Sequence, residues 1–459
     1  MKRRNNIQLT MLLAVLLVGC SQDDVLVTEQ QGAKANGDAI VLGVKEVKSQ
    51  VTRADQVTGV QTFSTLKEAD KGFGVYGYKG EYHNASSLPT LFKVSDGVGA
   101  NKHVTFVSGG TEPTTSLDIP GSWDYTSATT ANLVEWESGE KYTFFAYAPY
   151  MASAGDAPGI TNLKTDDTAG DPTISYTVAT DPAKSVDLLW GVRTDTQEKS
   201  GLPWIDIQQG QTTSAVLFTF YHALCALGLH AQVIVDQHNR LSELDDESSL
   251  GTIGSADGCK VTLKSITITP KTTSLHQSGV LNLNNYDDDA TNDGAHQPKW
   301  QSTSGSIASL VLNSSTTVNN ELLDPHPTEV DNTTGYEIMT SASYDTEVPG
   351  ITQSSNSQPI IKDDKLFMLI PQEAQDYTIS VEYFLTYKTG VSTYHRELVT
   401  RDVTLSNLEL VAGVKYYINL VIGLRTFKVN ISAMDWEEEP NFPTIASENG
   451  TSAGHSLAK

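Results

Sequence analysis

The clearest fold signal in this chain is VKYYINLVIGLRTFKVNISAMDW, residues 414–436. Apolar residues recur there at every second position on both sides of a short turn: Val414, Tyr416, Ile418, Leu420 and Ile422, then Phe427, Val429, Ile431 and Ala433. Successive side chains of a strand point to opposite faces, so this period places one face of each strand in a core. The stretch therefore predicts an antiparallel β-hairpin that closes near Trp436.

The same period recurs upstream of the hairpin. Apolar residues alternate with polar ones from Tyr377 to Tyr383, which predicts a strand with one wet face. Residues 141–149 are apolar or aromatic on both faces and end in Pro149, which is typical of a central strand buried on two sides. Shorter runs predict further strands at 72–78, 187–191, 216–221, 229–235, 279–283 and 366–372.

Two features interrupt this regular pattern. Val261 and Leu263 fall on one parity while Ile266 and Ile268 fall on the other, and this phase slip predicts a β-bulge between them. Residues 151–182 and 284–364 are polar and low in apolar periodicity, so we expect a long surface loop and then the longest irregular region. Trp123 and Trp136 are expected to pack in a core rather than to form a sugar-stacking platform.

The sequence predicts an all-β protein, because it contains no long amphipathic helical pattern and no glycine-rich phosphate loop. We expect two tandem sandwiches of short antiparallel strands. The predicted division is an N-terminal domain at 54–212, a C-terminal domain at 213–440 and a polar tail at 441–459. Residues 1–19 and 20–53 precede the first domain and form two separate segments.

Residues 1–19 are predicted to be an export signal. Lys2, Arg3 and Arg4 form a basic start, and the apolar run from Leu9 to Val18 is too short to span a bilayer. The tetrapeptide Leu17-Val18-Gly19-Cys20 resembles the bacterial lipobox. That resemblance implies cleavage before Cys20 and acylation of its thiol and new amino terminus.

Residues 20–53 are predicted to be a tether followed by a first strand. Ser21-Gln22-Asp23-Asp24 is similar to the acidic tag of surface-exported Bacteroidetes lipoproteins, although an ordinary solvated tether has the same composition. Residues 39–47 are rich in β-branched residues and predict a strand. The following Val51-Thr52-Arg53-Ala54 offers an arginine in a polar connection, where a trypsin-like protease could cut between Arg53 and Ala54.

Such a cut would have a structural consequence. It would separate the first strand from the body, and a sheet that loses an edge strand exposes unpaired N–H and C=O groups to a strand from another molecule. The alternative is that Arg53 is one exposed basic residue in a flexible tether, cut incidentally or never.

Composition excludes some partners. The 459 residues carry 31 basic and 55 acidic side chains, a formal charge of −24. Binding to nucleic acid or to an anionic lipid surface is therefore not expected. If Cys20 carries lipid, Cys225 and Cys259 remain, either as a disulfide or as two separately buried thiols.

No catalytic or metal site assembles from the sequence. His222 and His230 flank an apolar turn, and we interpret both as structural. The loop from Asp287 to Asp293 begins like a calcium loop, but position twelve counted from Asp289 is Trp300, where a bidentate Glu is wanted. We therefore expect no enzyme activity, no cofactor and no metal.

Several motifs together resemble the fimbrillin family of Bacteroidetes, the Mfa-like subunits of type V pili. They are the lipobox at Cys20, the residues around Arg53, the strand at 144–149, Asp187-Leu188-Leu189, residues 218–224, residues 368–372 and the closing stretch 413–436. Each motif is weak alone, whereas their order and spacing across nearly the whole chain are specific.

The resemblance implies two transthyretin-like β-sandwiches with Greek-key strands, exported as an outer-membrane surface lipoprotein and trimmed by an arginine-specific protease. It implies a shaft, tip or anchor subunit that polymerises in a fimbrium with other pilin subunits through a C-terminal donor strand. That strand would come from Phe442, Ile445 and Ala446 or from the final hairpin. The alternative function is a monomeric surface lipoprotein that binds a glycan or a host protein.

Overall fold

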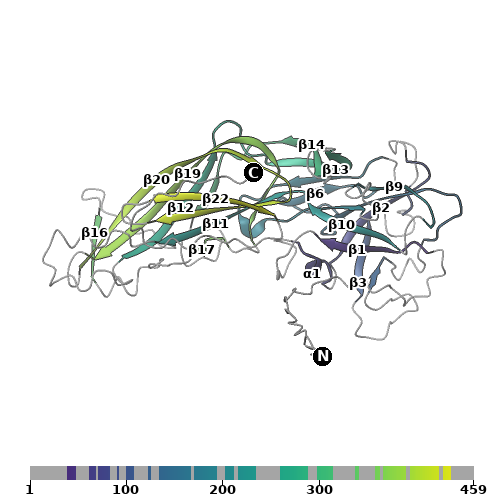
Figure 1. Cartoon of the computed structure of the whole chain (residues 1–459), viewed down its shortest axis with the longest axis horizontal. Coiled ribbons are helices and arrows are strands. Elements are labelled where there is room, and N and C mark those ends of the chain that lie inside the picture. Colours follow the sequence, from purple (N-terminus) through teal and green to yellow (C-terminus); the bar gives the residue numbers. More distant parts are fainter. Residues whose placement is uncertain are drawn as a thin grey trace, which may run out of the picture.

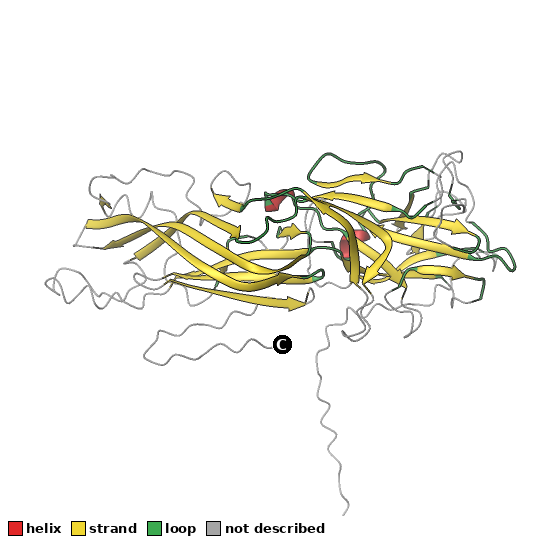
Figure 2. Cartoon of the chain, turned by 90° about the horizontal axis from the view of Figure 1, so that it is seen from above, coloured by secondary structure: helices red, strands yellow, loops and turns green. Residues whose placement is uncertain are grey.

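The helices and strands of the described residues are almost all β-strands, which confirms the predicted all-β class (Figures 1 and 2). The computed structural model describes residues 39–47, 61–68, 71–82, 90–92, 100–107, 122–125, 134–166, 170–193, 202–210, 215–233, 259–287, 297–313, 336–340, 357–361, 365–388, 393–422 and 427–435. Strands from the N-terminal half lie at one end of an elongated molecule and the long strands β19 and β20 extend to the other end (Figure 1).

The first sheet, which we call the N-terminal sheet, has eight strands in the order β1-β10-β8-β5-β2-β3-β4, with β9 paired to β5. The strands are β1 (Leu42–Val47), β2 (Phe73–Lys79), β3 (Lys102–Val107), β4 (Ser122–Asp124), β5 (Tyr142–Ala148), β8 (Leu189–Arg193), β9 (Trp204–Ile207) and β10 (Val216–His222). Every residue of β5 is buried, as its two-sided apolar sequence predicts. The sheet therefore needs packing on both of its faces.

A four-stranded bridging sheet, β14-β13-β7-β6, combines strands from both halves of the chain. They are β6 (Gly159–Leu163), β7 (Thr173–Thr177), β13 (Ser278–Asp287) and β14 (Gln297–Ser304). The pairing of β7 with β13 is antiparallel, from Ser278 opposite Thr177 to Asn282 opposite Thr173. This sheet therefore ties the N-terminal half to the C-terminal half through backbone hydrogen bonds.

Two five-stranded sheets contain the remaining described strands. The hairpin sheet, in the order β17-β11-β21-β22 with β18 paired to β11, contains β11 (Cys225–Val233), β17 (Gln358–Pro359), β18 (Phe367–Leu369), β21 (Val414–Ile422) and β22 (Phe427–Asp435). The long-strand sheet, in the order β15-β12-β19-β20-β16, contains β12 (Cys259–Pro270), β15 (Leu310–Asn313), β16 (Tyr336–Thr340), β19 (Gln372–Lys388) and β20 (Thr393–Leu410). The β21–β22 pairing is unbroken from Val414 opposite Asp435 to Ile422 opposite Phe427, so the predicted hairpin is confirmed.

Helix is confined to single turns in the described ranges. They are α1 (Phe63–Leu66), which starts with a capping box between Thr62 and Thr65, and the 3₁₀ turn η2 (Pro182–Lys184). Within the part of the chain that the structure describes, no helix has the length and hydropathy that a membrane span requires.

The described apolar side chains form two cores. The larger one runs through the molecule and includes Tyr147 of the N-terminal sheet, Ile174 of the bridging sheet, Leu229 of the hairpin sheet and Ile379 of the long-strand sheet. The smaller core lies on the opposite face of the N-terminal sheet and contains the apolar residues of β1 together with Phe73, Phe144, Phe218, Phe220 and Trp123. Trp136 packs against this smaller core, so both tryptophans have the packing role expected from the sequence.

The structure also differs from the sequence-based expectations. The expected surface loop at 151–182 contains β6 and β7, and the expected irregular region at 284–364 contains β14 to β17. The strand β14 is rich in Ser, Thr and Gln, and β6, β15, β16 and β17 have five residues or fewer, which leaves little apolar periodicity to detect. The strands are not all short or antiparallel, because β19 has 17 residues and β20 has 18, while β1 pairs parallel with β10 and β11 pairs parallel with β21.

The chain crosses from one sheet to another between β10 and β11. β10 pairs with β8 in the N-terminal sheet, whereas β11, which starts three residues after β10 ends, pairs with β21. We therefore propose that a division into domains falls between His222 and Cys225, about ten residues after the boundary expected at 212/213.

Candidate functional site: the seat of the first strand

The first strand, β1, occupies one edge of the N-terminal sheet. It pairs parallel with β10, from Leu42 opposite Val216 to Val47 opposite Phe220. The Val216 N–H donates to the carbonyl oxygen of Val41 over 2.8 Å. β10 is paired on its other side to β8, so β1 alone covers the second row of β10 backbone groups.

The apolar side chains of β1 are buried in the smaller core. Ile40, Leu42, Val44 and Val47 are each at most 7% exposed. Burial of such a side chain contributes roughly 1.5–3 kcal/mol, an upper estimate because unfolded chains also bury some surface. The strand is therefore an integral part of the core and could not leave without exposing Phe218 and Phe220, which share that core.

Polar contacts hold the start of the strand. The hydroxyl of Tyr125 donates to the carbonyl oxygen of Ile40 over 2.8 Å and accepts the N–H of Val134 at 3.0 Å. The N–H of Ile40 donates to the carbonyl oxygen of Val134 over 2.7 Å. Burial raises the pKa of Tyr125, so the hydroxyl stays protonated and remains a donor. We call Tyr125, Val134 and the edge of β10 that β1 covers the β1 site.

The opposite side of β1 is also closely covered. A Cβ atom built on Gly43 would lie 3.0 Å from Cδ2 of Leu217 and 3.4 Å from Cδ1 of Trp123. The backbone at Gly43 is not in the left-handed region, so the requirement for glycine is steric. Any side chain at this position must push Leu217 or Trp123 aside.

Gln61 is the next described residue after Val47, and its anchoring contacts differ from those of β1. The N–H of Gln61 donates to Oδ2 of Asp187 over 3.0 Å, and Leu66 of α1 is fully buried in the smaller core. Asp187 lies at the junction of the sheets, with Nδ1 of His222 2.7 Å from the same oxygen. The hydrogen bonds at the two ends of the connection between Val47 and Gln61 thus come from different groups, while Leu66 shares the smaller core with β1.

The predicted site residues themselves fall mainly elsewhere. Cys20, Arg53 and Ala54 lie outside the described residues, as does the tail at 441–459. Their roles therefore stay predictions. What the structure adds is the position of β1 and of Gln61, the described residues on either side of Arg53 and Ala54.

The remaining candidates have structural surroundings. Cys225 is a buried free thiol that donates to the carbonyl oxygen of Leu369, and burial raises its pKa to about 12. The side chain of Cys259 lies outside the described residues. His222 and His230 are both buried, and His230 packs edge-on against Tyr417. Trp300 donates its indole N–H to the carbonyl oxygen of Ala223, so the residue that interrupts the calcium pattern is a packing residue.

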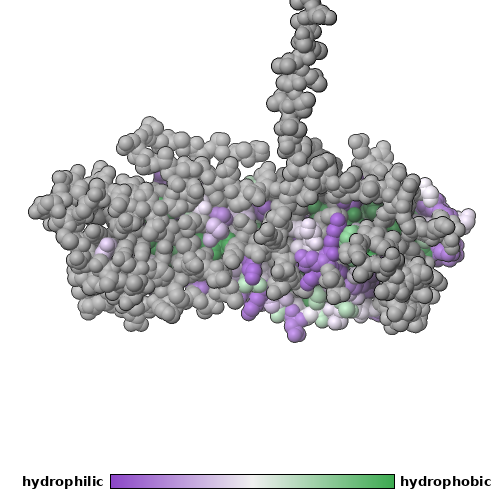
Figure 3. All heavy atoms as spheres, turned by 90° about the horizontal axis from the view of Figure 1, so that it is seen from below, coloured by the Kyte–Doolittle hydropathy of each residue, from purple (hydrophilic) through white to green (hydrophobic). Residues whose placement is uncertain are grey.

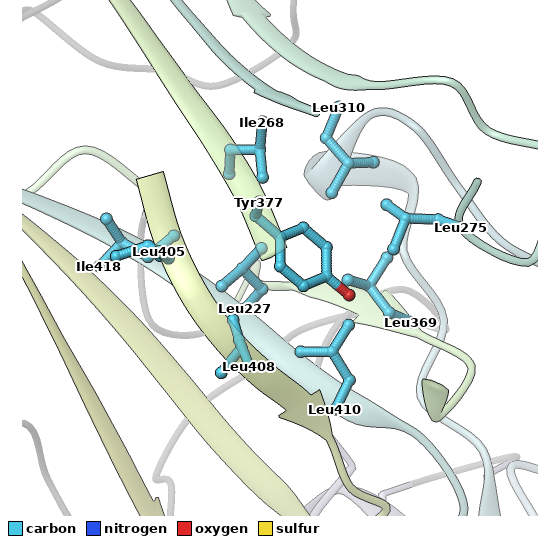
Figure 4. A pocket seen from close by; sticks show the side chains of 10 residues that line it. All are labelled: Leu227, Ile268, Leu275, Leu310, Leu369, Tyr377, Leu405, Leu408, Leu410 and Ile418. Carbon is cyan, nitrogen blue, oxygen red and sulfur yellow. The ribbon is translucent and has the colours of Figure 1, made fainter. Parts of the chain in front are cut away.

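No alternative site competes with the β1 site in the described ranges. No group of three or more His, Cys, Asp or Glu side chains is placed to hold a metal ion there. A small apolar pocket of about 10 Å³, room for roughly one water molecule, lies between the hairpin sheet and the long-strand sheet, lined by nine aliphatic side chains and Tyr377 (Figure 4). Its single hydroxyl is bonded to Gln375, so the pocket offers no chemistry for a polar substrate.

Strongly exposed large apolar side chains are rare among the described residues. On the face shown in Figure 3, hydrophilic and hydrophobic residues are mixed, without a broad apolar patch among the coloured atoms. Leu398, at 38% exposure, is the one large apolar side chain that is strongly exposed among the described residues. Among the described residues, the apolar side chains that the loss of β1 would uncover are therefore the main apolar contacts open to a partner.

The β1 site contains residues that the sequence did not single out. Tyr125 bonds to Ile40 across 85 residues of sequence, and Asp187 accepts from Gln61 across 126. No local sequence pattern predicts contacts over such separations. The spacing from Val44 to Val47 carried a usable signal, because two inward residues three positions apart require a bulge between them.

The fold is shared with a solved fimbrial protein. No family model and no curated protein matches the chain. A fimbrial protein from Bacteroides vulgatus is similar over 87% of this chain and 99% of its own, with 20% identity and a TM-score of 0.55. Proposed cell adhesion proteins from Bacteroides uniformis (13% identity, TM-score 0.37, 87% of this chain and 99% of that one) and Bacteroides ovatus (14%, 0.35, 88% and 99%) are less similar.

The likeness to the Bacteroides vulgatus protein extends over most of this chain and nearly all of the other. At 20% identity it concerns the fold and not the chemistry of individual residues. The resemblance to Bacteroidetes fimbrillins that the motifs predicted is thus confirmed at the level of the fold: the chain has the architecture of a Bacteroides fimbrial protein.

Proposed function

We infer that the chain is a structural subunit of a type V pilus in which β1 is a removable strand that blocks assembly. The observation that carries this inference is the position of β1, an edge strand whose loss would uncover β10 and a buried apolar face. An uncovered sheet edge accepts a strand from another chain. The subunit would be non-enzymatic and act in adhesion at the cell surface.

Proteolysis at Arg53 would release β1 without unfolding the body, by which we mean the described residues from Gln61 onward. Residues 48–60 connect β1 to Gln61, and Arg53 lies within them. The bond to Asp187 and the capping box of α1 hold the chain from Gln61 onward without β1, whereas Leu66 packs in the smaller core that β1 shares. The new amino terminus at Ala54 would therefore follow a folded body.

A tail segment suits the role of donor better than the final hairpin. β22 pairs with β21 over nine residue pairs, and its Val429 and Ile431 pack against the larger core. Donating β22 would uncover that core, at a cost of several kcal/mol in lost burial. We therefore assign the donor role to residues around Phe442, Ile445 and Ala446.

The anchoring step rests on Cys20. Acylation there would place the subunit in the outer membrane facing outward, and cleavage at Arg53 would then free the body from the lipid. A subunit that keeps its lipid would serve as the anchor, and a trimmed one would serve in the shaft or tip.

An arginine-specific protease tests the proposal. The purified chain, starting at Ser21, is treated with a limiting amount of enzyme, the new terminus at Ala54 is confirmed by mass spectrometry, and size is followed by light scattering. We expect oligomers to grow from the wild type and not from Arg53→Ala. A wild type trimmed at Ala54 that stays monomeric would contradict the assembly step and favour a surface lipoprotein that acts as a monomer.

A further inference from the structure

The pairing of β1 with β10 contains an irregularity. Residues match one to one from Leu42 opposite Val216 to Val44 opposite Phe218, and the next pair is Glu46 opposite Thr219. Lys45 therefore has no opposite residue. It is the extra residue of a β-bulge.

The bulge follows from the spacing of the apolar residues of β1. Leu42, Val44 and Val47 all belong to the smaller core. In a regular strand Val44 and Val47, three positions apart, would point to opposite faces. The extra residue restores the phase, so that Val47 reaches the core that Val44 already occupies.

The irregularity belongs to β1 and not to its neighbour. On its other side β10 pairs with β8 without a break, from Phe218 opposite Arg193 to His222 opposite Leu189. Bulges are rare in parallel pairs, and each one leaves a residue unpaired and disrupts the ladder locally. The edge of β10 is thus regular, and β1 is an imperfect match for it.

We propose that Lys45 is a built-in weakness of β1: the extra residue makes β1 a weaker occupant of the β10 edge than an uninterrupted strand would be, so that β1 can leave once the chain is cut. This inference rests on the proposed function and adds a reason why β1 can be displaced. An uninterrupted strand has inward apolar residues at strictly alternate positions, the pattern that β1 itself would show without Lys45: Ile40, Leu42, Val44 and Val47.

The inference has a direct test, because deletion of Lys45 makes the strand regular while each apolar residue keeps its face. The protein is cut with arginine-specific protease, and retention of the fragment ending at Arg53 is measured by size exclusion across a urea series. We expect the variant lacking Lys45 to hold its fragment about fivefold more tightly, the equivalent of one recovered backbone hydrogen bond. A variant lacking Gln50 shortens the chain equally outside β1 and serves as the matched control.

A second measurement protects the test against a variant that folds poorly. Labelled peptides of residues 39–47, with and without Lys45, are titrated onto wild-type body from which the fragment has been removed in urea. Tighter binding of the peptide without Lys45 supports the proposal. Equal binding, or tighter binding of the natural peptide, overturns it.

These outcomes are separate from those of the proposed function. If trimmed wild-type protein stays monomeric while the peptides still differ, then the assembly step fails and the preference of the β10 edge stands. If oligomers form while the peptides bind equally, then assembly stands and the role of Lys45 is wrong.

Discussion

The backbone N–H of Gln61 donates to Oδ2 of Asp187 over 3.0 Å, in a site where the Asp187 side chain is fully buried. This contact joins the first described residue after the Arg53 segment to the junction between the N-terminal sheet and the rest of the molecule. Nδ1 of His222 lies 2.7 Å from the same oxygen. A buried carboxylate therefore anchors the start of the body, and neither of these two contacts involves β1.

Replacement of Asp187 should destabilise the body. Asp187→Ala leaves the N–H of Gln61 buried without its acceptor, which costs about 1–3 kcal/mol, and it also removes the neighbour of His222. Asp187→Asn retains an oxygen of the same shape and is the matched control. Urea unfolding measures both. Equal free energies of unfolding for the two variants would show that the contact contributes nothing.

Tyr125→Phe should loosen β1 while the rest of the sheet stays intact. The change removes the donor to Ile40 and the acceptor for Val134, and each group left unsatisfied costs about 1–3 kcal/mol. Hydrogen exchange of the amides in β1 should accelerate. Tyr150→Phe removes a hydroxyl from a half-buried tyrosine outside the β1 site and should leave that exchange unchanged. Protection of β1 that is the same in both variants would contradict the assigned role of Tyr125.

Side-chain periodicity predicted the faces of the strands well. The one-sided pattern of residues 414–433 and the two-sided pattern of β5 both appear as expected. The phase slip between Leu263 and Ile266 corresponds to a register shift between Leu263 and Ser265. These features are local, because the period of a strand is set by its own side chains and the core that they meet.

The neighbours of each strand could not be predicted in the same way. A period of two shows which residues point inward but not which strand lies alongside, so the parallel partner of β1, some 170 residues away, left no signal. The polar strand β14 was missed because Gln, Ser and Thr pair through their backbones. Long-range contacts such as Gln61 with Asp187 depend on the completed topology.

The Cys225 thiol should be unreactive in the folded protein. Its pKa is raised to about 12 by burial, against about 8.5 for an exposed thiol, so the folded state keeps the proton that the unfolded state loses. Stability from this residue is complete below about pH 8.5 and falls as the pH rises toward 12. In a chain from Ser21 with Cys259→Ala, a thiol reagent at pH 8 should label Cys225 only in urea. Adding Leu398→Cys supplies an exposed control; prompt labelling of Cys225 itself would refute its burial.

Cys20→Ala should release the protein from the membrane fraction of the producing cell. The expectation rests on Leu17-Val18-Gly19-Cys20 after an apolar run. One acyl chain binds a membrane only with a constant of about 10⁴ M⁻¹, so several chains at Cys20 would be needed for firm anchoring. Labelled palmitate should enter the wild type and not the variant. Absence of label from the wild type would remove the lipid anchor from the proposed function.

Gly43→Val should open the β1 site without any proteolysis. The Cβ atom of the new side chain would lie 3.0 Å from Cδ2 of Leu217, and its methyl groups would need further space beside Trp123. Such overpacking costs about 1–3 kcal/mol. Valine favours strands and the backbone at residue 43 is unstrained, so the change acts on the fit of β1 and not on its conformation.

The variant is best studied together with Arg53→Ala, so that cleavage cannot contribute. If β1 is the block to assembly, light scattering should detect oligomers in Gly43→Val and fewer in Gly43→Ala, whose single methyl group needs only a small movement of Leu217. Hydrogen exchange reports independently whether β1 has loosened. If the double variant exchanges rapidly in β1 and still stays monomeric, then an open β10 edge is not sufficient for assembly. In that case β1 would have loosened without the oligomers that its loss is expected to cause.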